Sequence, residues 1–342
     1  MLKDTLKELC CLDGISGREN EVRERIISLI GDKAEVRTDN LGNVIAFCRG
    51  KKTPEKKLMI SAHMDEVGFM VTYINEDGTL CFTPVGGIDP RVCFGKRVRV
   101  GRQKITGLIA GSAIHNVAKA DRNKVKGLDK LVIDIGADSK AEAEKLVRQG
   151  DSVYFTSEFT EFGSGMITSK AIDDRAGCAV MIEMINEGVE FDTYFTFVVQ
   201  EEIGLRGSGC AAFSVEPDFA IVLEATTASD IPSESGADRV CEVGKGAVVS
   251  IIDRATIYDE GLSSLAFELA EDNGIPAQTK TKAAGGNDAG AIHQSREGVR
   301  TAAISVPCRY LHSPVCVIRE DDLNSVYKLA RLLADRILAD DL

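Results

Sequence analysis

Two adjacent glutamates follow an apolar run near the middle of the chain, and their chemistry suits either metal binding or proton transfer. The run covers residues 194–199, is β-type, and is followed by Gln200, Glu201 and Glu202. In open α/β sheets the functional groups lie in loops at the carboxyl ends of the strands. Because neighbouring residues of an extended chain point to opposite sides, Glu201 and Glu202 are expected to have different roles. Alone, such a pair is more typical of a solvated strand end.

Ligand-type side chains recur after other apolar runs of the chain. The further candidates are His63, Asp173, Glu224 and His312. Imidazoles and carboxylates together suit zinc, cobalt or manganese rather than calcium. One catalytic zinc ion uses three protein ligands, and this set is larger. Two metal ions about 3.5–4 Å apart, sharing a carboxylate and a water molecule, would use the whole set.

Two further carboxylates are expected to support these candidates. Asp65 stands two residues after His63, where it is expected to accept the other ring proton of that imidazole and fix its tautomer. Asp174 directly follows Asp173, at the start of a predicted helix.

Predicted strands and helices alternate around these residues, which indicates an α/β domain. Strands are predicted at residues 34–37, 43–48, 58–61, 193–200, 219–223, 247–252 and 301–306. Helices are predicted at residues 2–11, from 16, from 173, and at 207–213, 261–272 and 321–338. Several of the strands run directly into the candidate ligands, so the site is expected at the ends of the strands.

Residues 68–159 have a different pattern. Short β-type runs alternate there with turn signals such as Gly86-Gly87, and one predicted helix at residues 139–148 interrupts them. Regular short strands with little helix are typical of a small β-rich module. A chain of 342 residues also exceeds what one hydrophobic core usually serves. We therefore expect residues 68–159 to form an insert in a larger domain made of residues 1–67 and 160–342.

Composition excludes several classes of partner and location. The net charge of −12 argues against nucleic acid or an anionic membrane surface as a partner. No apolar run reaches the ~18 residues of a transmembrane helix, and residues 1–5 lack the layout of a signal peptide. The chain has ten cysteines and no Cys-x-x-Cys pair, which predicts reduced thiols. A cytoplasmic protein is therefore expected.

Five segments together resemble the motif set of the tetrahedral (TET) aminopeptidase and glutamyl aminopeptidase family, some of whose members are labelled endoglucanases. They are SAHMDEVGF at 61–69, AIDDRAG at 171–177, VVQEEIGLRG at 198–207, GGNDAGAI at 285–292 and VPCRYLHSP at 306–314. The segments stand in the family's order, and the resemblance covers essentially the whole chain. It implies a mixed-sheet, zinc-exopeptidase-like α/β fold in which residues 68–159 form a PDZ-like oligomerisation module.

The resemblance also implies a set of metal ligands: His63, Asp173, Glu202, Glu224 and His312. Asp173 would bridge two divalent ions, which would be zinc or cobalt, with manganese as a further option. His312 and Glu202 would complete one ion, and His63 with Glu224 the other.

The same resemblance implies supporting roles for other residues of these motifs. Glu201 would be the general base for the attacking water, Asp65 would orient His63, and Asp174 would support the turn after the bridging ligand. The chain departs from the family at Glu224, where many members have Asp, and at Asn287, where Thr is commoner. The first departure bears on the choice of metal, and the second on the substrate side.

Four other residues are assigned without a metal role. His115, in the insert, is expected to be structural or exposed, and His293 to lie on a helix face near the site. Arg309 and Tyr310 precede His312 and are expected either to line the substrate pocket or to belong to a strand edge.

The predicted function is a metal-dependent aminopeptidase that acts on peptides with a free N-terminus through a water activated by two metals. The resemblance implies a homo-oligomer, with a tetrahedral dodecamer as one form. One alternative is an N-acyl amino-acid deacylase with a similar site. An endoglucanase would need two carboxylates across a sugar cleft and would leave His63 and His312 without a role. A scaffold without activity is a further alternative, and the presence of Glu201 argues against it.

Overall fold

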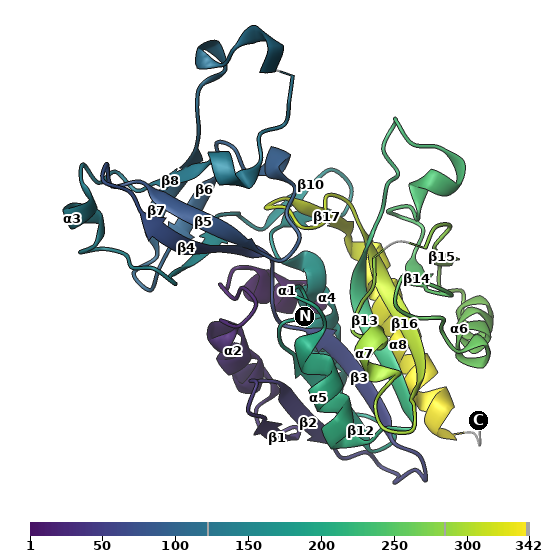
Figure 1. Cartoon of the computed structure of the whole chain (residues 1–342). Coiled ribbons are helices and arrows are strands. Elements are labelled where there is room, and N and C mark those ends of the chain that lie inside the picture. Colours follow the sequence, from purple (N-terminus) through teal and green to yellow (C-terminus); the bar gives the residue numbers. More distant parts are fainter. Residues whose placement is uncertain (122, 284, 340–342) are drawn as a thin grey trace.

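An eight-stranded mixed sheet forms the centre of the larger part of the molecule (Figure 1). The computed structural model describes residues 1–121, 123–283 and 285–339. In spatial order, the strands of this sheet are β1 (Glu35–Thr38), β2 (Val44–Cys48), β12 (Thr193–Val198), β3 (Leu58–His63), β13 (Phe219–Thr227), β16 (Arg300–Cys308), β14 (Ala247–Val249) and β15 (Ala277–Thr279).

The four central strands of this sheet run parallel. β3 pairs in parallel with β12 on one side and with β13 on the other, and β13 pairs in parallel with β16. The carboxyl ends of these four strands therefore meet at one edge of the sheet. In parallel sheets this edge is where ligand sites form.

Helices cover both faces of the sheet, because side chains of a strand alternate between two separate cores. Leu58 and Ile60 of β3 belong to one core, and Met59 belongs to the other. The first core also contains residues of α1 (Leu2–Cys10), α2 (Asn20–Ile30), α4 (Ile172–Glu187), α6 (Glu260–Asp272) and α8 (Glu320–Ala339). The second contains residues of α5 (Arg206–Val215) and α7 (Ala289–Ile292).

A closed six-stranded barrel lies beside the sheet, at the upper left of Figure 1. Its strands are β4 (Gly68–Ile74), β5 (Leu80–Val85), β8 (Val132–Asp134), β7 (Ile105–Ala110), β6 (Arg97–Val100) and β9 (Ser152–Phe155). The barrel has a core of its own, in which Phe69 contacts Phe82 and Phe155 edge to face. A short helix, α3 (Lys140–Ala143), belongs to this part of the chain.

The remaining elements are short. A three-stranded sheet contains β10 (Thr160–Phe162), β11 (Met166–Ser169) and β17 (Cys316–Arg319). The 3-10 turns are η1 (Pro90–Val92), η2 (Ile114–Asn116), η3 (Lys119–Asp121), η4 (Leu128–Lys130) and η5 (Gly236–Arg239).

The predicted mixed α/β fold is confirmed, and several boundaries differ from the prediction. The helix predicted at residues 139–148 ends at Ala143, and residues 144–146 form turns, one of them closed by a hydrogen bond from Leu146 N to Ala143 O. The strand predicted at residues 247–252 ends at Val249. Glu224 lies inside β13, which continues to Thr227. Strands β8, β10 and β15 were missed because runs of three residues carry little periodic signal.

Two further predictions can be compared with the structure. In the described part of the chain, no helix is long and apolar enough to cross a membrane. All ten cysteines are unpaired, as predicted from their spacing.

Candidate metal centre

The predicted ligands meet at the carboxyl edge of the parallel strands. His63 is the last residue of β3, Glu224 lies on β13, Glu202 follows β12, and His312 follows β16. Asp173 reaches the same place from the start of α4. Asp173 and Asp174 have non-helical backbone angles, and the peptide bond between them is cis, so the regular helix begins after them.

Asp173 contacts both histidines, each through a different carboxylate oxygen. His63 Nε2 lies 3.3 Å from Asp173 Oδ1 and 3.4 Å from Glu224 Oε1. His312 Nε2 lies 3.6 Å from Asp173 Oδ2 and 3.3 Å from Glu202 Oε2. Each triplet of ligand atoms lies within 4.8 Å. The carboxylate of Asp173 is therefore shared between two ligand groups.

The spacing of these atoms fits metal coordination. Ligands bound tetrahedrally at about 2.0–2.1 Å lie about 3.3 Å from one another. The contacts of 3.3 Å and 3.4 Å around His63 Nε2, and that of 3.3 Å between His312 and Glu202, match this value. One imidazole and two carboxylates in each group form a donor set that suits zinc, cobalt or manganese. The residues therefore fit two divalent ions with Asp173 between them.

Glu201 and Glu202 occupy different positions, although they are adjacent. Glu202 contacts His312 and belongs to one ligand group, whereas Glu201 lines the cavity outside both groups. Both glutamates stand in a tight turn: Gln200, directly before them, has a φ of +58°, and the backbone oxygen of Glu201 accepts from the N–H groups of Gly204 and Leu205. The two adjacent side chains therefore have different surroundings.

Asp65 contacts both the histidine and the turn that carries the two glutamates. His63 Nδ1 lies 3.0 Å from the backbone oxygen of Asp65 and 3.4 Å from its Oδ1, so the main chain and the carboxylate share this contact. The carboxylate also accepts the Ser16 hydroxyl at 2.6 Å and the peptide N–H groups of Glu201 and Glu202 at 3.0 and 3.1 Å. This second set of contacts had no signal in the sequence.

Burial and mutual contact shift the pKa values of the clustered groups. Burial raises the pKa values of Glu202 and Glu224 to about 8. Burial also raises the pKa of Glu201 well above its usual value, and the charge of Glu224 adds to this shift. The pKa of His312 is raised to about 10 against the effect of burial, by its contacts with Asp173 and Glu202. The carboxylates therefore favour positive charge between them.

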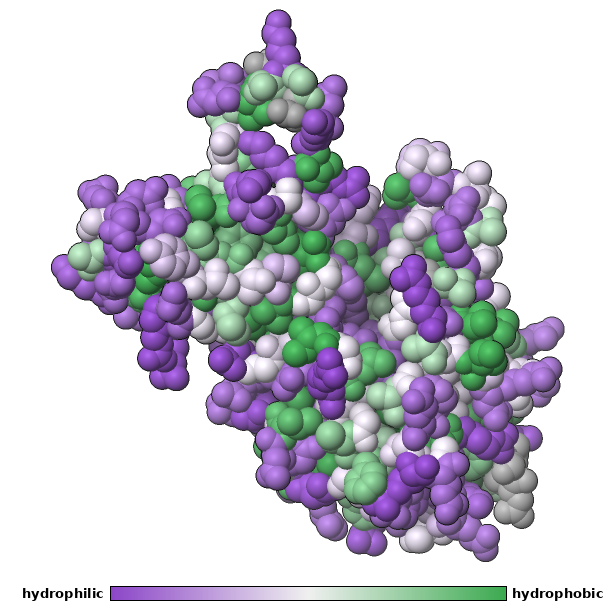
Figure 2. Space-filling model, viewed as in Figure 1, coloured by the Kyte–Doolittle hydropathy of each residue, from purple (hydrophilic) through white to green (hydrophobic). Residues whose placement is uncertain are grey.

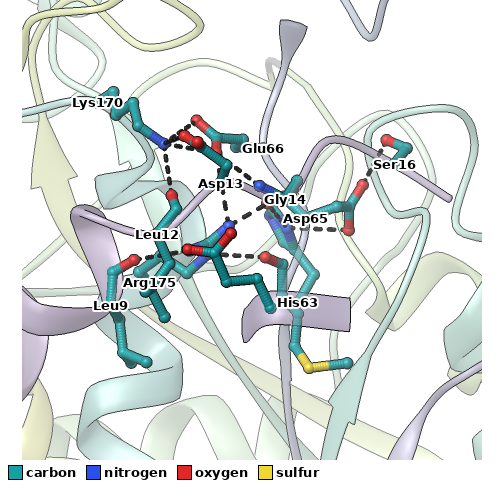
Figure 3. A network of polar contacts seen from close by, with 12 residues as sticks. Leu9, Leu12, Asp13, Gly14, Ser16, His63, Asp65, Glu66, Lys170 and Arg175 are labelled. Atoms are coloured by element: carbon teal, nitrogen blue, oxygen red, sulfur yellow. Dashed lines mark hydrogen bonds and ion pairs between the residues drawn. The ribbon is translucent and has the colours of Figure 1, made fainter. Parts of the chain in front are cut away.

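A buried ion-pair network lies behind the ligands and joins the loops that carry them (Figure 3). Lys170 Nζ lies 2.6 Å from Glu66 Oε1 and 2.6 Å from the backbone oxygen of Leu12. Arg175 donates to the backbone oxygens of Met64 and Leu9, both at 2.7 Å. Lys170 and Arg175 flank Asp173, and Glu66 follows the His63 loop. The network therefore holds the two ligand-bearing segments against each other.

The same network reaches the barrel. Asp13 lies 3.5 Å from Lys170, and it also pairs with Arg99 of β6 and with Lys104. Both Asp13 and Lys170 are buried. A buried ion pair of this kind fixes a geometry, because loss of one partner leaves an uncompensated charge.

The ligands line one wall of a cavity of about 730 Å³. Figure 2 shows that the surface is hollowed between the barrel, at the upper left of the view, and the part of the molecule at the upper right. Gly86 and Gly87 bring a barrel turn against the site: a Cβ atom at Gly86 would lie 3.3 Å from Glu202 Cβ, and one at Gly87 would lie 3.5 Å from His312 Nδ1. The volume is in the range of small-molecule sites.

The other predicted residues divide between the cavity and the surrounding structure. Asn287 and Tyr310 line the cavity, whereas Arg309 pairs with Asp230 at 2.6 Å. His115 lies in η2, and His293 ends α7, where its Nδ1 lies 2.7 Å from the backbone oxygen of Ala289. Neither histidine belongs to a ligand group.

Asp174 contacts the helix rather than the cavity. Its Oδ1 accepts the peptide N–H of Gly177 at 2.9 Å, which joins Asp174 to the first regular turn of α4.

Sequence reasoning missed five polar residues around the site: Ser16, Glu19, Glu66, Lys170 and Lys280. Glu66 lies inside a motif that was recognised, so its position gave a signal. Lys170 directly precedes the motif at 171–177. Ser16, Glu19 and Lys280 stand in segments without ligand-type spacing, and only the fold brings them to the site.

Comparison with known proteins identifies the family. The family model described as M42 glutamyl aminopeptidase matches residues 42–329. The chain belongs to the M42 aminopeptidase family. An Acetivibrio thermocellus relative is 41% identical over 329 residues, which cover 95% of this chain and 96% of the relative. The lysyl aminopeptidase of Pyrococcus furiosus is 33% identical, covering 98% of this chain and 97% of that protein.

Solved structures of proteins with similar sequences have the same fold. The TET1 peptidase of Pyrococcus horikoshii, described as assembling into a tetrahedron or a large octahedral shell, has a TM-score of 0.86, 34% identity, and coverage of 98% of this chain and 99% of that one. A Thermotoga maritima structure named as an endoglucanase has a TM-score of 0.80, 37% identity, and coverage of 97% and 96%. The predicted hydrolase and aminopeptidase function is confirmed, and the deacylase and endoglucanase alternatives are not favoured.

Proposed function

We propose that this M42 aminopeptidase holds two divalent metal ions. Asp173 would bridge them, His63 and Glu224 would complete one site, and His312 and Glu202 would complete the other. The observation that carries this assignment is the carboxylate of Asp173, whose Oδ1 faces His63 at 3.3 Å and whose Oδ2 faces His312 at 3.6 Å. Zinc or cobalt suits the donor sets best, and manganese is a further option.

The protein side chains around the ions have separate roles in the proposed hydrolysis. The ions supply Lewis-acid activation of water and of a carbonyl group. Glu201 is the general base that accepts a proton from the attacking water, because it lines the cavity without belonging to a ligand group. Asp65 is a positioning residue that holds the His63 ring and the backbone of Glu201.

The proposed substrates are peptides with a free N-terminus. A panel of aminoacyl chromogenic substrates, assayed with added cobalt, zinc or manganese, tests this assignment. Release from free-amino substrates and none from their N-blocked forms is expected. Formation of a free amino group and a carboxylic acid from an N-acyl amino acid would instead indicate a deacylase. Hydrolysis of carboxymethylcellulose that survives metal removal would indicate an endoglucanase.

The insert is proposed to serve assembly. We assign residues 1–67 and 160–342 to the catalytic domain, and residues 68–159 to a PDZ-like oligomerisation domain, on the basis of the barrel and its separate core. A homo-oligomer of the tetrahedral dodecamer type is proposed from the assemblies described for TET relatives. Nucleic acid and membrane are not expected as partners of a chain with a net charge of −12. A cytoplasmic location is proposed from the ten unpaired cysteines.

A further inference from the structure

Three isoleucines are exposed on one short hairpin beside the main sheet. The hairpin covers residues 251–258, between β14 and α6, and Ile252 pairs with Ile257 in an antiparallel bridge. The side chains of Ile251, Ile252 and Ile257 are 50%, 44% and 80% exposed. A single exposed apolar side chain is ordinary, whereas a group of them marks a surface that contacts another molecule.

Hydrogen bonds hold this hairpin in one conformation. The buried Asp253 accepts the peptide N–H groups of Ala255 and Thr256 at 2.7 and 2.8 Å through Oδ1, and its Oδ2 accepts the Tyr258 hydroxyl at 2.5 Å. Tyr258 in turn accepts from Asn287 Nδ2 at 3.0 Å. A surface that is already ordered loses little conformational freedom when a partner binds.

The hairpin also contacts the glycine-rich wall of the metal-centre cavity. The peptide N–H of Arg254 donates to the backbone oxygen of Gly285 at 2.9 Å, and a Cβ atom at Gly286 would lie 3.3 Å from Ala255 Cβ. Gly285 and Gly286 line the cavity. These contacts use the backbone and Ala255, so the isoleucine side chains can be changed without altering them.

A tetrahedral dodecamer requires at least two different contact surfaces on each chain. A contact across a twofold axis alone closes into a dimer, and a contact across a threefold axis alone closes into a trimer. Only the two kinds of contact together link all copies of an assembly such as the one described for TET relatives. The barrel accounts for one of these contacts, which leaves a second surface to be assigned.

The isoleucine hairpin has the position and the chemistry that this second surface needs. Contacts about two different axes face in different directions. Figure 1 shows β14 and α6, the elements on either side of the hairpin, at the right of the molecule, and the barrel at the upper left. Copies with a net charge of −12 repel one another, so an apolar surface is suited to join them.

We propose that Ile251, Ile252 and Ile257 form a second assembly surface, which packs against another copy of this chain. Together with the barrel, this surface closes the oligomer. The inference rests on the homo-oligomer proposed above.

Light scattering of metal-loaded, full-length protein tests this surface. Ile257→Glu places a charge at the most exposed of the three positions, and burial of an unpaired charge is unfavourable. We expect the mass to fall from that of the wild-type oligomer to that of a dimer or a trimer. Hydrolysis of an aminoacyl p-nitroanilide should keep a kcat/KM within about threefold of the wild type, because the contacts of the hairpin with the cavity wall lie within one chain.

Two control variants separate the apolar contact from other effects. Leu41→Glu adds the same charge to an exposed apolar residue in the turn between β1 and β2, at the other end of the sheet, and should keep the wild-type mass. Ile257→Leu keeps the apolar surface and should also keep it. An equal fall in mass in Leu41→Glu would assign the effect to added negative charge and would overturn the inference.

The outcomes also distinguish this inference from the proposed function. If the wild type is an oligomer and Ile257→Glu keeps its mass, the second surface is wrong while the proposed homo-oligomer stands. A monomeric wild type would disprove both. If Ile257→Glu keeps the mass and raises KM for long peptides but not for the p-nitroanilide, the hairpin binds substrate rather than another copy.

Photo-crosslinking tests the contact without placing a charge in it. The photoreactive residue p-benzoylphenylalanine at position 257 should join chains covalently on irradiation, and the same residue at position 41 should not. Crosslinked chains from position 257 support the surface even if Ile257→Glu fails to fold. Their absence from a wild-type-sized oligomer would overturn it.

Discussion

Asp65 Oδ1 accepts the peptide N–H of Glu201 at 3.0 Å, which ties the loop after β3 to the loop after β12. The same carboxylate faces the ring of His63, so one side chain connects a proposed metal ligand with the proposed base. The backbone of Glu201 is thereby fixed by protein contacts rather than by a metal. Changes to the Glu201 side chain should consequently leave the metal centre in place.

Substitution of Glu201 by glutamine should separate the two adjacent glutamates. Glu201→Gln is expected to keep both ions and to lose at least ~100-fold in kcat with little change in KM, because glutamine cannot accept the proton. Glu202→Gln should instead weaken metal binding, since Glu202 contacts His312 at 3.3 Å. Metal content and turnover are measured on the same preparations. Loss of metal from Glu201→Gln, or near-normal turnover, would show that the roles are reversed or wrong.

Substitution of Asp173 should remove more metal ions than substitution of His312. Asp173 faces both ligand groups, whereas His312 belongs to one. Asp173→Asn is therefore expected to weaken binding of both ions, and His312→Ala to leave one ion in the group of His63 and Glu224. Elemental analysis after reconstitution measures the stoichiometry. Equal loss in the two variants would contradict a bridging role for Asp173, and one ion or fewer in the wild type would contradict the dinuclear centre.

Glu19 should make the stability of the fold depend on pH. Burial raises the pKa of Glu19 from 4.5 to about 7, so between these values the folded state binds more protons than the unfolded state. The contribution of Glu19 to the free energy of unfolding is complete below pH 4.5 and is lost as the pH rises through 7. The total loss is about 3 kcal/mol. Glu19→Gln keeps an oxygen that can accept from Gly17 and Gln200 and removes the ionisation.

Urea unfolding at pH 5 and pH 8 measures this effect. The free energy of unfolding of Glu19→Gln should match the wild type at pH 5 and exceed it at pH 8. Glu24→Gln is the control, because Glu24 is an exposed glutamate of the same helix, α2. The same difference between Glu19→Gln and the wild type at both pH values would argue against a raised pKa for Glu19.

Removal of the barrel should change assembly without destroying the main fold. The barrel core and the main core share no residues, so residues 1–67 joined to 160–342 by a short linker should still fold. Light scattering should report a smaller species than the full chain, and far-UV circular dichroism should retain the helical signal. An unchanged assembly size would rule out the barrel as the assembly module.

The sequence alone determined most strands of the main sheet, the order of the motifs and the candidate ligands. Runs such as residues 58–61 and 219–223 are apolar and end in His63 and Glu224, and this pattern depends only on local spacing. The parallel pairing of β3 with β12 and β13 then brings those ends together, as expected for an α/β sheet.

The tertiary structure decided which polar residues surround the ligands. Ser16 and Lys280 are far from the metal ligands in sequence, and the fold places them beside the site. Lys170 stands three residues before Asp173, but its partner Glu66 is 104 residues away in the chain. The two contacts of the Asp173 carboxylate likewise depend on where β3 and the loop after β16 lie. Spacing along the chain encodes the type and period of an element, whereas the partner of a buried charge depends on which distant segments the core packs together.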